Sequence, residues 1–155
     1  SDQALALLGN AATPDEIAVL GGIAYQKNEV VLHTDTRLLP KRKRAWAAWN
    51  YNLDANVNDR ATLTYNMNLL QGIEAPVTFC VTLNNTQAIA PDQILGVYQY
   101  DHPVYNHYTL AAQQQRSKIN GVNHTYYCGA YWYNGFHEDG VRSAVDIARA
   151  MGVEF

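Results

Sequence analysis

Residues Tyr126–Ala144, with the sequence YYCGAYWYNGFHEDGVRSA, decide the fold near the end of the chain. The segment begins with an apolar run and has glycines at positions 129 and 135, with aromatic residues between them. Beyond Gly140, apolar residues recur at helical spacing: Val141, Ala144, Val145, Ala148 and Met151. The pattern predicts a strand, a glycine-bounded turn and then a helix to about Met151 with one apolar face to bury.

The expected junction between turn and helix is a potential ligand site. The first N–H groups of a helix have no partner within the helix, so they attract anions and electron-rich carbonyl groups. Gly129 and Gly140 carry no Cβ and would let a ligand lie against the backbone. The alternative is that the aromatic residues only pack the core and that Glu138 and Asp139 are ordinary acids of the first turn.

The segment Cys128–Ala148 resembles the C-terminal FAD-binding segment of the flavin-containing amine oxidase and phytoene desaturase superfamily. In that family, a helix of the pattern aromatic-x-E-G-A-V-x-S/A-G-x-x-A begins beneath the flavin ring. The counterpart here is Gly135–Ala144, GFHEDGVRSA, which is most similar to a bacterial subgroup of amine oxidase-like proteins. His33–Pro40 (HTDTRLLP) and Trp46–Tyr51 (WAAWNY) also resemble that subgroup, so the resemblance extends over nearly the whole chain.

The resemblance implies a fragment of an FAD-dependent oxidoreductase that supplies a substrate-domain sheet and the flavin-ring end of the cofactor site. FAD would take a hydride from a C–N or C–C bond of the substrate. The residues implied in cofactor binding are Gly129, Ala130, Trp132, Gly135, Phe136, Asp139, Gly140 and Val141. The residues implied in a substrate pocket are Trp49, Tyr51, Tyr133 and His137. No catalytic residue and no metal ligand is assigned.

The same resemblance implies how the helix start would meet the flavin. The backbone N–H groups of Asp139, Gly140 and Val141 would face flavin O2 and N1, where negative charge gathers on reduction. Aromatic side chains of the turn, Phe136 among them, would form a wall beside the ring. His137 and Glu138 are ionisable groups at this position, and either could transfer a proton.

Three features depart from the family's pattern. Ala130 stands where the family has an acidic residue, and Asp139-Gly140 replaces the Gly-Ala pair of the helix. The fingerprint G-x-G-x-x-G is absent, since no two of the ten glycines are separated by a single other residue. We therefore expect the AMP half of FAD to require a missing Rossmann domain of the same polypeptide. This piece, which starts inside an expected helix, should be inactive alone and retain little or no FAD.

Composition sets the broad class. The chain has 155 residues, of which 48% are hydrophobic and 16% charged, which predicts one folded unit over 1–155. A net charge of -3 creates no general field for nucleic acid, and no apolar run reaches membrane-spanning length. Without a signal peptide we expect a cytoplasmic protein. Cys80 and Cys128 are expected as reduced thiols in buried strands, with a disulfide left open.

Residues 1–22 are expected to form a helical connector. Asp2–Leu8 has helix-forming residues and ends before a Gly-Asn pair. Thr13 then provides an N-cap, Pro14 the first helical position and Glu16 the second half of a capping box.

Residues 23–121 are expected to form a substrate-domain-like sheet, followed by a flavin-facing strand-turn-helix unit at 122–155. Alternating apolar residues predict strands at 29–35, 46–51, 61–66, 77–83 and 95–100. The second and third should pair antiparallel across a polar loop at 52–59. A short helix is predicted at 67–72 and a longer one at 108–119, capped by Asn106, with Gln113–Gln115 facing solvent. The fold class is α+β, a mostly antiparallel sheet with a few flanking helices.

Two polar features in the expected sheet have alternative interpretations. His33 fits a hydrogen-bonded structural residue, with a ligand or proton-transfer role as the alternative. Lys41–Arg44 is a run of four basic residues that fits a solvated turn, with steering of an anionic substrate as the alternative.

Other functions stay open from the sequence. The chain could be a stand-alone domain whose aromatic pocket binds a small apolar or cationic ligand. It could also be an interaction module that pairs through exposed strand edges, or a homodimer formed through uncovered apolar surface. Serine hydrolase and metalloenzyme functions are disfavoured, because G-x-S-x-G, HExxH and Cys-x-x-Cys are absent.

Overall fold

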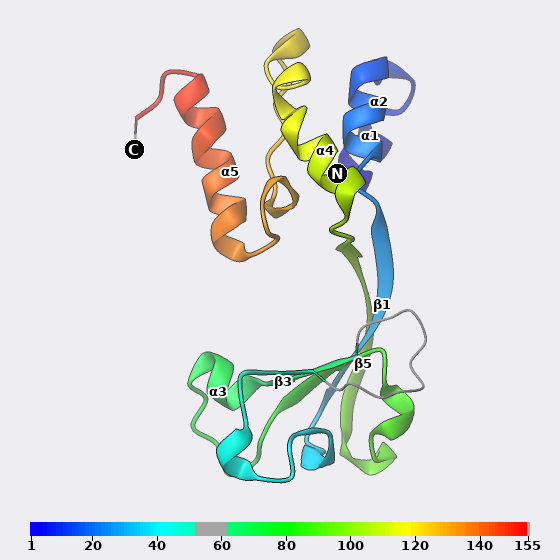
Figure 1. Ribbon diagram of the computed structural model, residues 1–155, viewed down its shortest axis with the longest axis vertical. Helices are drawn as coiled ribbons and strands as arrows, with labels where there is room; N and C mark the ends of the chain where they lie inside the picture. Colours follow the sequence, from blue (N-terminus) through cyan, green and yellow to red (C-terminus); the bar gives the residue numbers. More distant parts are fainter. Residues whose placement is uncertain (52–61, 155) are drawn as a thin grey trace. The chain divides into compact units, whose positions relative to one another are not determined.

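The computed structural model describes residues 1–51 and 62–154, so the predicted loop at 52–59 lies outside the described residues. The chain divides into two compact units, where the sequence suggested one (Figure 1). Ser1–Gln26 and His102–Phe155 make up the first, here the helical unit, and Lys27–Asp101 the second, here the sheet unit. Each unit is described by itself.

An antiparallel sheet and flanking helices confirm the predicted α+β class. The strands are β1 (Tyr25–His33), β2 (Trp49–Tyr51), β3 (Leu63–Asn66), β4 (Cys80–Leu83) and β5 (Ile94–Pro103). Their order is β2-β3-β4-β1-β5, which makes β2 and β5 the edge strands. The predicted antiparallel pairing of the second and third strands is confirmed, with Trp49 opposite Tyr65 and Tyr51 opposite Leu63.

Side-chain hydrogen bonds explain why two strands are shorter than predicted. Asn50 bonds through its side-chain amide to both the N–H and the carbonyl of Ala47, which makes a turn before β2. The Asn68 side chain accepts from the Phe79 N–H and donates to the Val77 carbonyl, at 2.8 and 2.9 Å. These bonds occupy backbone groups that a strand ladder would need. β5, in contrast, continues to Pro103 and does not stop at residue 100.

The sheet buries its polar face. Alternation along the strands, combined with the register, places the following residues on one side: His33, Asn50, Thr64, Asn66, Cys80 and Thr82. All of them are buried. Thr82 Oγ1 lies 2.7 Å from His33 Nε2 and 2.8 Å from Thr64 Oγ1, so these buried polar atoms satisfy one another.

The opposite face of the sheet is apolar and only partly covered. It carries Val30, Leu32, Trp49, Tyr51, Leu63, Tyr65, Val81 and Leu83. Val30 and Leu63 are buried, whereas Trp49 is 41% and Tyr51 62% exposed. Trp49 packs edge-on against Tyr65 with ring centroids 5.2 Å apart. This half of the sheet therefore offers apolar and aromatic surface to a further partner.

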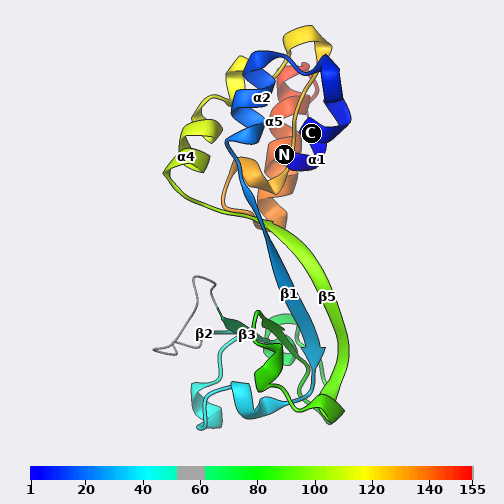
Figure 2. The same cartoon turned by 90° about the vertical axis from the view of Figure 1, so that its right-hand side faces the viewer.

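The helical unit contains α1 (Asp2–Leu8), α2 (Pro14–Gly21), α4 (His107–Gln114) and α5 (His137–Ala150), which Figure 2 shows gathered together. α3 (Met67–Gln71) follows β3 in the sheet unit, as predicted. The predicted capping box of α2 is confirmed: Thr13 N–H donates to the Glu16 carboxylate and Glu16 N–H donates to Thr13 Oγ1. Among the described residues, no helix has the length and apolar character needed to cross a membrane.

The Asn106 cap of α4 is also confirmed, since Asn106 Oδ1 accepts the N–H groups of Tyr108 and Thr109. α4 itself ends at Gln114, earlier than predicted, and a 3-10 turn at Arg116–Lys118 follows.

A single apolar cluster holds the helical unit together. It consists of Val19, Leu20, Ile23, Ala112, Ile119, Tyr127 and Trp132. The Tyr127 hydroxyl donates to the buried Glu16 carboxylate at 2.5 Å, which links the C-terminal part of the chain to α2. This hydrogen bond holds the pKa of Glu16 below its usual value.

The expected strand at 126–128 is an extended segment without strand pairing. Side chains take the backbone groups that a ladder would use. Tyr127 N–H donates to Asn120 Oδ1 at 2.9 Å, and the Tyr127 carbonyl accepts from Trp132 Nε1 at 2.8 Å. Cys80 and Cys128 are both free; Cys80 is buried as expected, but Cys128 is exposed. Burial raises the pKa of the Cys80 thiol to about 11.

Candidate functional site

The start of α5 is the candidate site. The backbone N–H groups that are free there are not the ones that the sequence predicted. The N–H groups of Asp139 and Gly140 both donate to the Phe136 carbonyl, at 3.0 and 3.2 Å, so the first turn uses them. The N–H groups of His137 and Glu138 find no acceptor in the part of the chain that the structure describes. The donors available to a ligand are therefore those of His137 and Glu138.

Asp139 serves the fold and does not present its side chain to a ligand. It is buried, and its Oδ2 accepts the N–H groups of Asn134 and Phe136, at 3.1 and 3.0 Å. A carboxylate in the first turn also interacts favourably with the helix dipole. Asp139 thus fixes the turn that precedes α5 and so sets the direction in which the free N–H groups point.

Three of the predicted cofactor residues meet at one close contact. A Cβ added to Gly140 would lie 3.9 Å from the Cβ and the N of Ala130, so the helix start and the extended segment nearly touch. Gly129 N–H donates to Ser143 Oγ at 2.8 Å, and this hydroxyl donates to the Gly140 carbonyl at 2.8 Å. Gly129 has φ 153 and ψ 156, a region that is essentially restricted to glycine.

The aromatic turn is mostly structural. Trp132 is buried. The Tyr133 hydroxyl donates to Asp146 at 2.5 Å, and the Arg142 guanidinium lies 4.0 Å from the Tyr133 ring centroid. Gln113, which was expected to face solvent, instead donates to the carbonyls of Tyr131 and Tyr133, each at 2.8 Å. These contacts hold the turn in place.

Phe136 and Gly135 remain at the surface next to the helix start. Phe136 is 55% exposed, so it is the aromatic residue of the turn that could contact a ligand ring. Gly135 has φ 91, and a Cβ there would lie 2.5 Å from the Tyr105 hydroxyl. A side chain at position 135 would therefore be strained and would displace Tyr105.

The apolar face of α5 is only partly covered, whereas a buried face was expected. Val145 and Ala148 are half-buried, but Val141 is 58% exposed, Ala144 is exposed, and Met151, just beyond the helix, is 60% exposed. The buried residues of the helix are Asp139 and Ser143, because α5 packs through its small and polar face against the segment that begins at Gly129. An apolar stripe therefore runs along α5 from its exposed N-terminal end.

Arg116 organises the packing of α5, and the sequence did not reveal it. Its Nη1 donates to Asp146 Oδ2 and its Nη2 to the Ser143 carbonyl, both at 2.9 Å. The guanidinium also lies 5.3 Å from the Trp132 ring centroid. The hydrogen bond from Tyr133, followed by Arg116, lowers the pKa of Asp146. A tertiary contact of this kind has no signal in sequence spacing.

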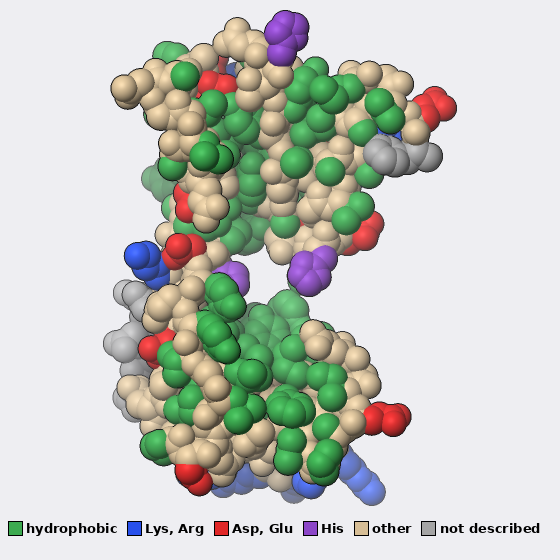
Figure 3. Space-filling view, turned by 180° about the vertical axis from the view of Figure 1, so that it is seen from behind, with side chains coloured by type: hydrophobic (Ala, Val, Ile, Leu, Met, Phe, Trp, Pro, Cys, Tyr) green, Lys and Arg blue, Asp and Glu red, His purple; other side chains and the backbone are tan. Residues whose placement is uncertain are grey.

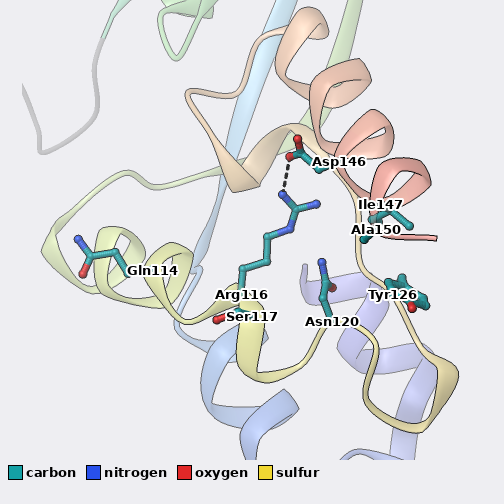
Figure 4. A pocket seen from close by; sticks show the side chains of 8 residues that line it. All are labelled: Gln114, Arg116, Ser117, Asn120, Tyr126, Asp146, Ile147 and Ala150. Carbon is teal, nitrogen blue, oxygen red and sulfur yellow. Dashed lines mark hydrogen bonds and ion pairs between the residues drawn. The ribbon is translucent and has the colours of Figure 1, made fainter. Parts of the chain in front are cut away.

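The Arg116–Asp146 ion pair lines a groove of about 460 Å³ beside the second half of α5 (Figure 4). Its lining residues are Gln114, Arg116, Ser117, Asn120, Tyr126, Asp146, Ile147 and Ala150. In Figure 4 the Arg116 side chain extends toward Asp146 and is occupied by that contact. None of the predicted site residues lines this groove.

The four predicted substrate-pocket residues belong to different units. Trp49 and Tyr51 lie on the apolar face of the sheet unit, whereas Tyr133 and His137 belong to the helical unit. Tyr133 is committed to Asp146, and His137 is exposed at the start of α5. Among the described residues, no three metal-ligating side chains come together.

His33 has the structural environment expected of a hydrogen-bonded residue. It is fully buried, its Nδ1 accepts the Asp35 N–H at 3.1 Å, and its Nε2 lies 2.7 Å from Thr82 Oγ1. Because Nδ1 accepts, the proton is on Nε2. Burial lowers the pKa of His33, which favours the neutral form of the imidazole. Asp35 in turn is held by Arg37 and by the Ala90 N–H, which keep its pKa well below the usual value.

Comparison with known proteins assigns no family, since no protein-family model and no curated protein sequence matches the chain. The function is therefore argued from the free amides at the start of α5, the apolar face of the sheet and the sequence resemblance.

Proposed function

We propose that this chain is part of an FAD-dependent oxidoreductase of the amine oxidase type, in which it supplies the substrate-domain sheet and the contact to the flavin ring. The observation that carries the proposal is the pair of adjacent free N–H groups at His137 and Glu138. They lie where the helix of the resembling family begins beneath the flavin. The proposal includes a cytoplasmic location.

The residues at this helix start fit an isoalloxazine ring. Two backbone donors at a helix N-terminus suit the electron-rich edge of such a ring. Phe136 and Val141, both more than half exposed, offer apolar surface beside those donors. The Tyr131 ring covers Gly129 and Ala130 lies against Gly140, so a ligand would meet the helix start and not the backbone of Gly129.

FAD, when bound, would supply the hydride acceptor for the reaction. The contribution of this chain is to bind and orient. The N–H groups of His137 and Glu138 would hold the edge of the ring on which negative charge develops, a form of electrostatic stabilisation that fixed donors perform well. Phe136 and Val141 would exclude water from that edge.

The sheet unit supports the substrate half of the proposal. At the paired positions of β1–β4, the residues on its partly exposed face are aliphatic or aromatic, and none is charged. Trp49, at the edge of this face, would contact the substrate. A face of this composition suits an apolar molecule or an apolar part of one.

The proposal requires a binding site for the AMP half of FAD, which a Rossmann domain of the same polypeptide would provide. Translating the coding sequence upstream tests this: a strand followed by G-x-G-x-x-G is expected. The longer protein should purify with the visible absorption of bound flavin. Residues 1–155 alone should purify with little or no flavin. A longer protein that is folded and colourless, and that takes up no added FAD, contradicts the proposal.

A further inference from the structure

The basic run Lys41–Arg44, here the basic loop, is an exposed cluster of positive charge in the sheet unit. All four side chains are exposed. No carboxylate among residues 1–51 and 62–154 forms an ion pair with any of them. Lys43 alone has a ring contact, with its Nζ 5.6 Å from the centroid of Trp46. Four positive charges are therefore displayed together.

The backbone holds the basic loop in a tight turn. Ala45 N–H donates to the Arg42 carbonyl at 2.8 Å, and Trp46 N–H donates to the Lys43 carbonyl at 3.1 Å. The Trp46 indole closes the turn by donating to the Pro40 carbonyl at 2.8 Å. The four cations therefore need little further ordering to act on a common target.

A groove connects the basic loop to exposed aromatic surface. Its volume is about 440 Å³, and its lining residues are Arg37, Leu38, Leu39, Pro40, Lys41, Asn50, Tyr51, Asn85 and Ala88. Arg37 is paired with Asp35, at 2.5 Å, whereas Lys41, the second cation of this groove, has no ion pair among residues 1–51 and 62–154. Figure 3 shows Lys and Arg side chains gathered at one end of the sheet unit, next to its hydrophobic surface.

We propose that the basic loop and Tyr51 dock the sheet unit on the surface of a bilayer that contains anionic phospholipid, with a lipid phosphate beside Lys41. Each Lys or Arg near such a surface contributes about 1 kcal/mol of attraction, which acts within a Debye length. The net charge of -3 is that of the whole chain, whereas Lys41–Arg44 place four positive charges next to one another in sequence. Tyrosine side chains are suited to the boundary between headgroups and hydrocarbon.

The observations favour a lipid surface over a nucleic acid. Within the described part of the chain, the groove combines Lys41, which has no ion pair there, with aliphatic side chains, two asparagines and the ring of Tyr51. Binding of single-stranded nucleic acid uses a positively charged groove that follows the backbone, with several aromatic rings on which bases stack. A phosphate at Lys41 with apolar surface next to it matches the headgroup and the upper acyl region of a phospholipid.

The test is flotation of the whole chain with vesicles of phosphatidylcholine containing about a third phosphatidylserine, against vesicles of phosphatidylcholine alone, at low and high salt. We expect binding to the anionic vesicles only, weakened by salt. A triple variant, Lys41→Gln, Arg42→Gln and Arg44→Gln, should weaken binding on the order of a hundredfold, since each cation contributes about fivefold. Tyr51→Ser should weaken the binding that persists at high salt.

A charge-matched control separates a local site from net charge. The control removes an equal number of positive charges from exposed positions outside the basic loop: Lys27→Gln, Lys118→Gln and Arg149→Gln. It should leave binding nearly unchanged. Equal loss in both triple variants, or binding to phosphatidylcholine alone, overturns the proposal. So does tighter binding to a single-stranded RNA oligonucleotide than to the anionic vesicles. None of these measurements depends on flavin.

Discussion

Gly129 donates its amide hydrogen to the hydroxyl of Ser143 at 2.8 Å, and this hydroxyl donates to the Gly140 carbonyl. The hydrogen bond fastens the extended segment to the first turns of α5. Ser143 is fully buried, so no water can replace it without rearrangement. The position of the free amides at the start of α5 depends on this contact.

Ser143→Ala should therefore destabilise the chain by about 1 kcal/mol, because it leaves the half-buried Gly129 N–H without its acceptor. Urea unfolding followed by circular dichroism measures the change. Ser117→Ala, at an exposed position, is the matched control and should change stability by less than about 0.5 kcal/mol. Equal midpoints for the two variants would show that the Gly129–Ser143 bond contributes nothing.

The two glycines of the contact should respond to alanine in opposite directions. Gly129→Ala should destabilise by about 1–3 kcal/mol, because its backbone region is costly for other residues. Its Cβ would also lie 2.3 Å from the Tyr131 ring. Gly140→Ala should stabilise by about 0.5–1 kcal/mol, since it lies within α5 and its Cβ finds ordinary contacts at 3.9 Å. Thermal unfolding of both variants measures the difference, and a gain for Gly129→Ala would contradict the backbone geometry.

Arg116→Lys should destabilise the helical unit by about 1–3 kcal/mol, because an ammonium group cannot replace both hydrogen bonds to Asp146 and Ser143 and the stacking on Trp132. Arg149→Lys, at an exposed position of the same helix, is the control and should have little effect. Urea unfolding of the two variants measures the difference in their free energies of unfolding. Similar values for both variants would mean that Arg116 does not organise α5.

Stability should fall as the pH is lowered below about 6.5, the usual pKa of histidine. The pKa of His33 is lowered by burial, so the folded state prefers the neutral ring and the unfolded state takes up the proton first. The contribution is fully present above the unfolded-state pKa and is lost as the pH falls toward the folded-state pKa. The depressed pKa of Asp35 has the same sign but acts at lower pH, below its usual value of about 3.9.

Unfolding free energies measured between about pH 7.5 and 5.5 check this, because that window spans the usual pKa of histidine. His33→Gln should flatten the profile, whereas His137→Gln, at an exposed position, should leave it unchanged. A profile that His33→Gln does not alter would assign the pH dependence to another group.

Local signals predicted much of the fold. The capping box of Thr13 and Glu16 and the cap at Asn106 depend on residues close in sequence, and both are confirmed. The β2–β3 pairing follows from alternation on either side of one loop, and it is confirmed as well. Strand ends were less predictable, because Asn50 and Asn68 compete for backbone groups through their side chains.

Periodicity does not say which face of an element is covered. α5 has an apolar stripe, yet it packs through Ser143 and Asp139, because Arg116 and Gly129 provide partners for its polar face. In the sheet, alternation predicts two faces but not that the face with His33 is the buried one. Both outcomes depend on contacts between residues distant in sequence.

The candidate site stays a prediction, and its contacts differ from the sequence-based expectation. Gly129 and Gly140 were expected to leave room for a ligand, whereas the Tyr131 ring covers Gly129 and Ala130 lies against Gly140. The N–H groups of Asp139 and Gly140, which were expected to be free for a ligand, instead donate to the Phe136 carbonyl. Hydrogen-bond geometry at a helix start, with shifts of one or two residues, is beyond what a sequence pattern specifies.

The most direct test of the central claim is the flavin dissociation constant of the longer protein carrying His137→Pro, compared with His137→Ala. Proline is tolerated at the first position of a helix, and Phe136, with φ -84 and ψ 163, has the conformation that a following proline requires. His137→Pro removes one free N–H, while His137→Ala removes the imidazole and keeps the N–H. We predict flavin affinity about tenfold weaker for His137→Pro than for His137→Ala, the loss expected for one hydrogen bond. Equal affinities would contradict the proposal that the amides at the start of α5 hold the flavin ring.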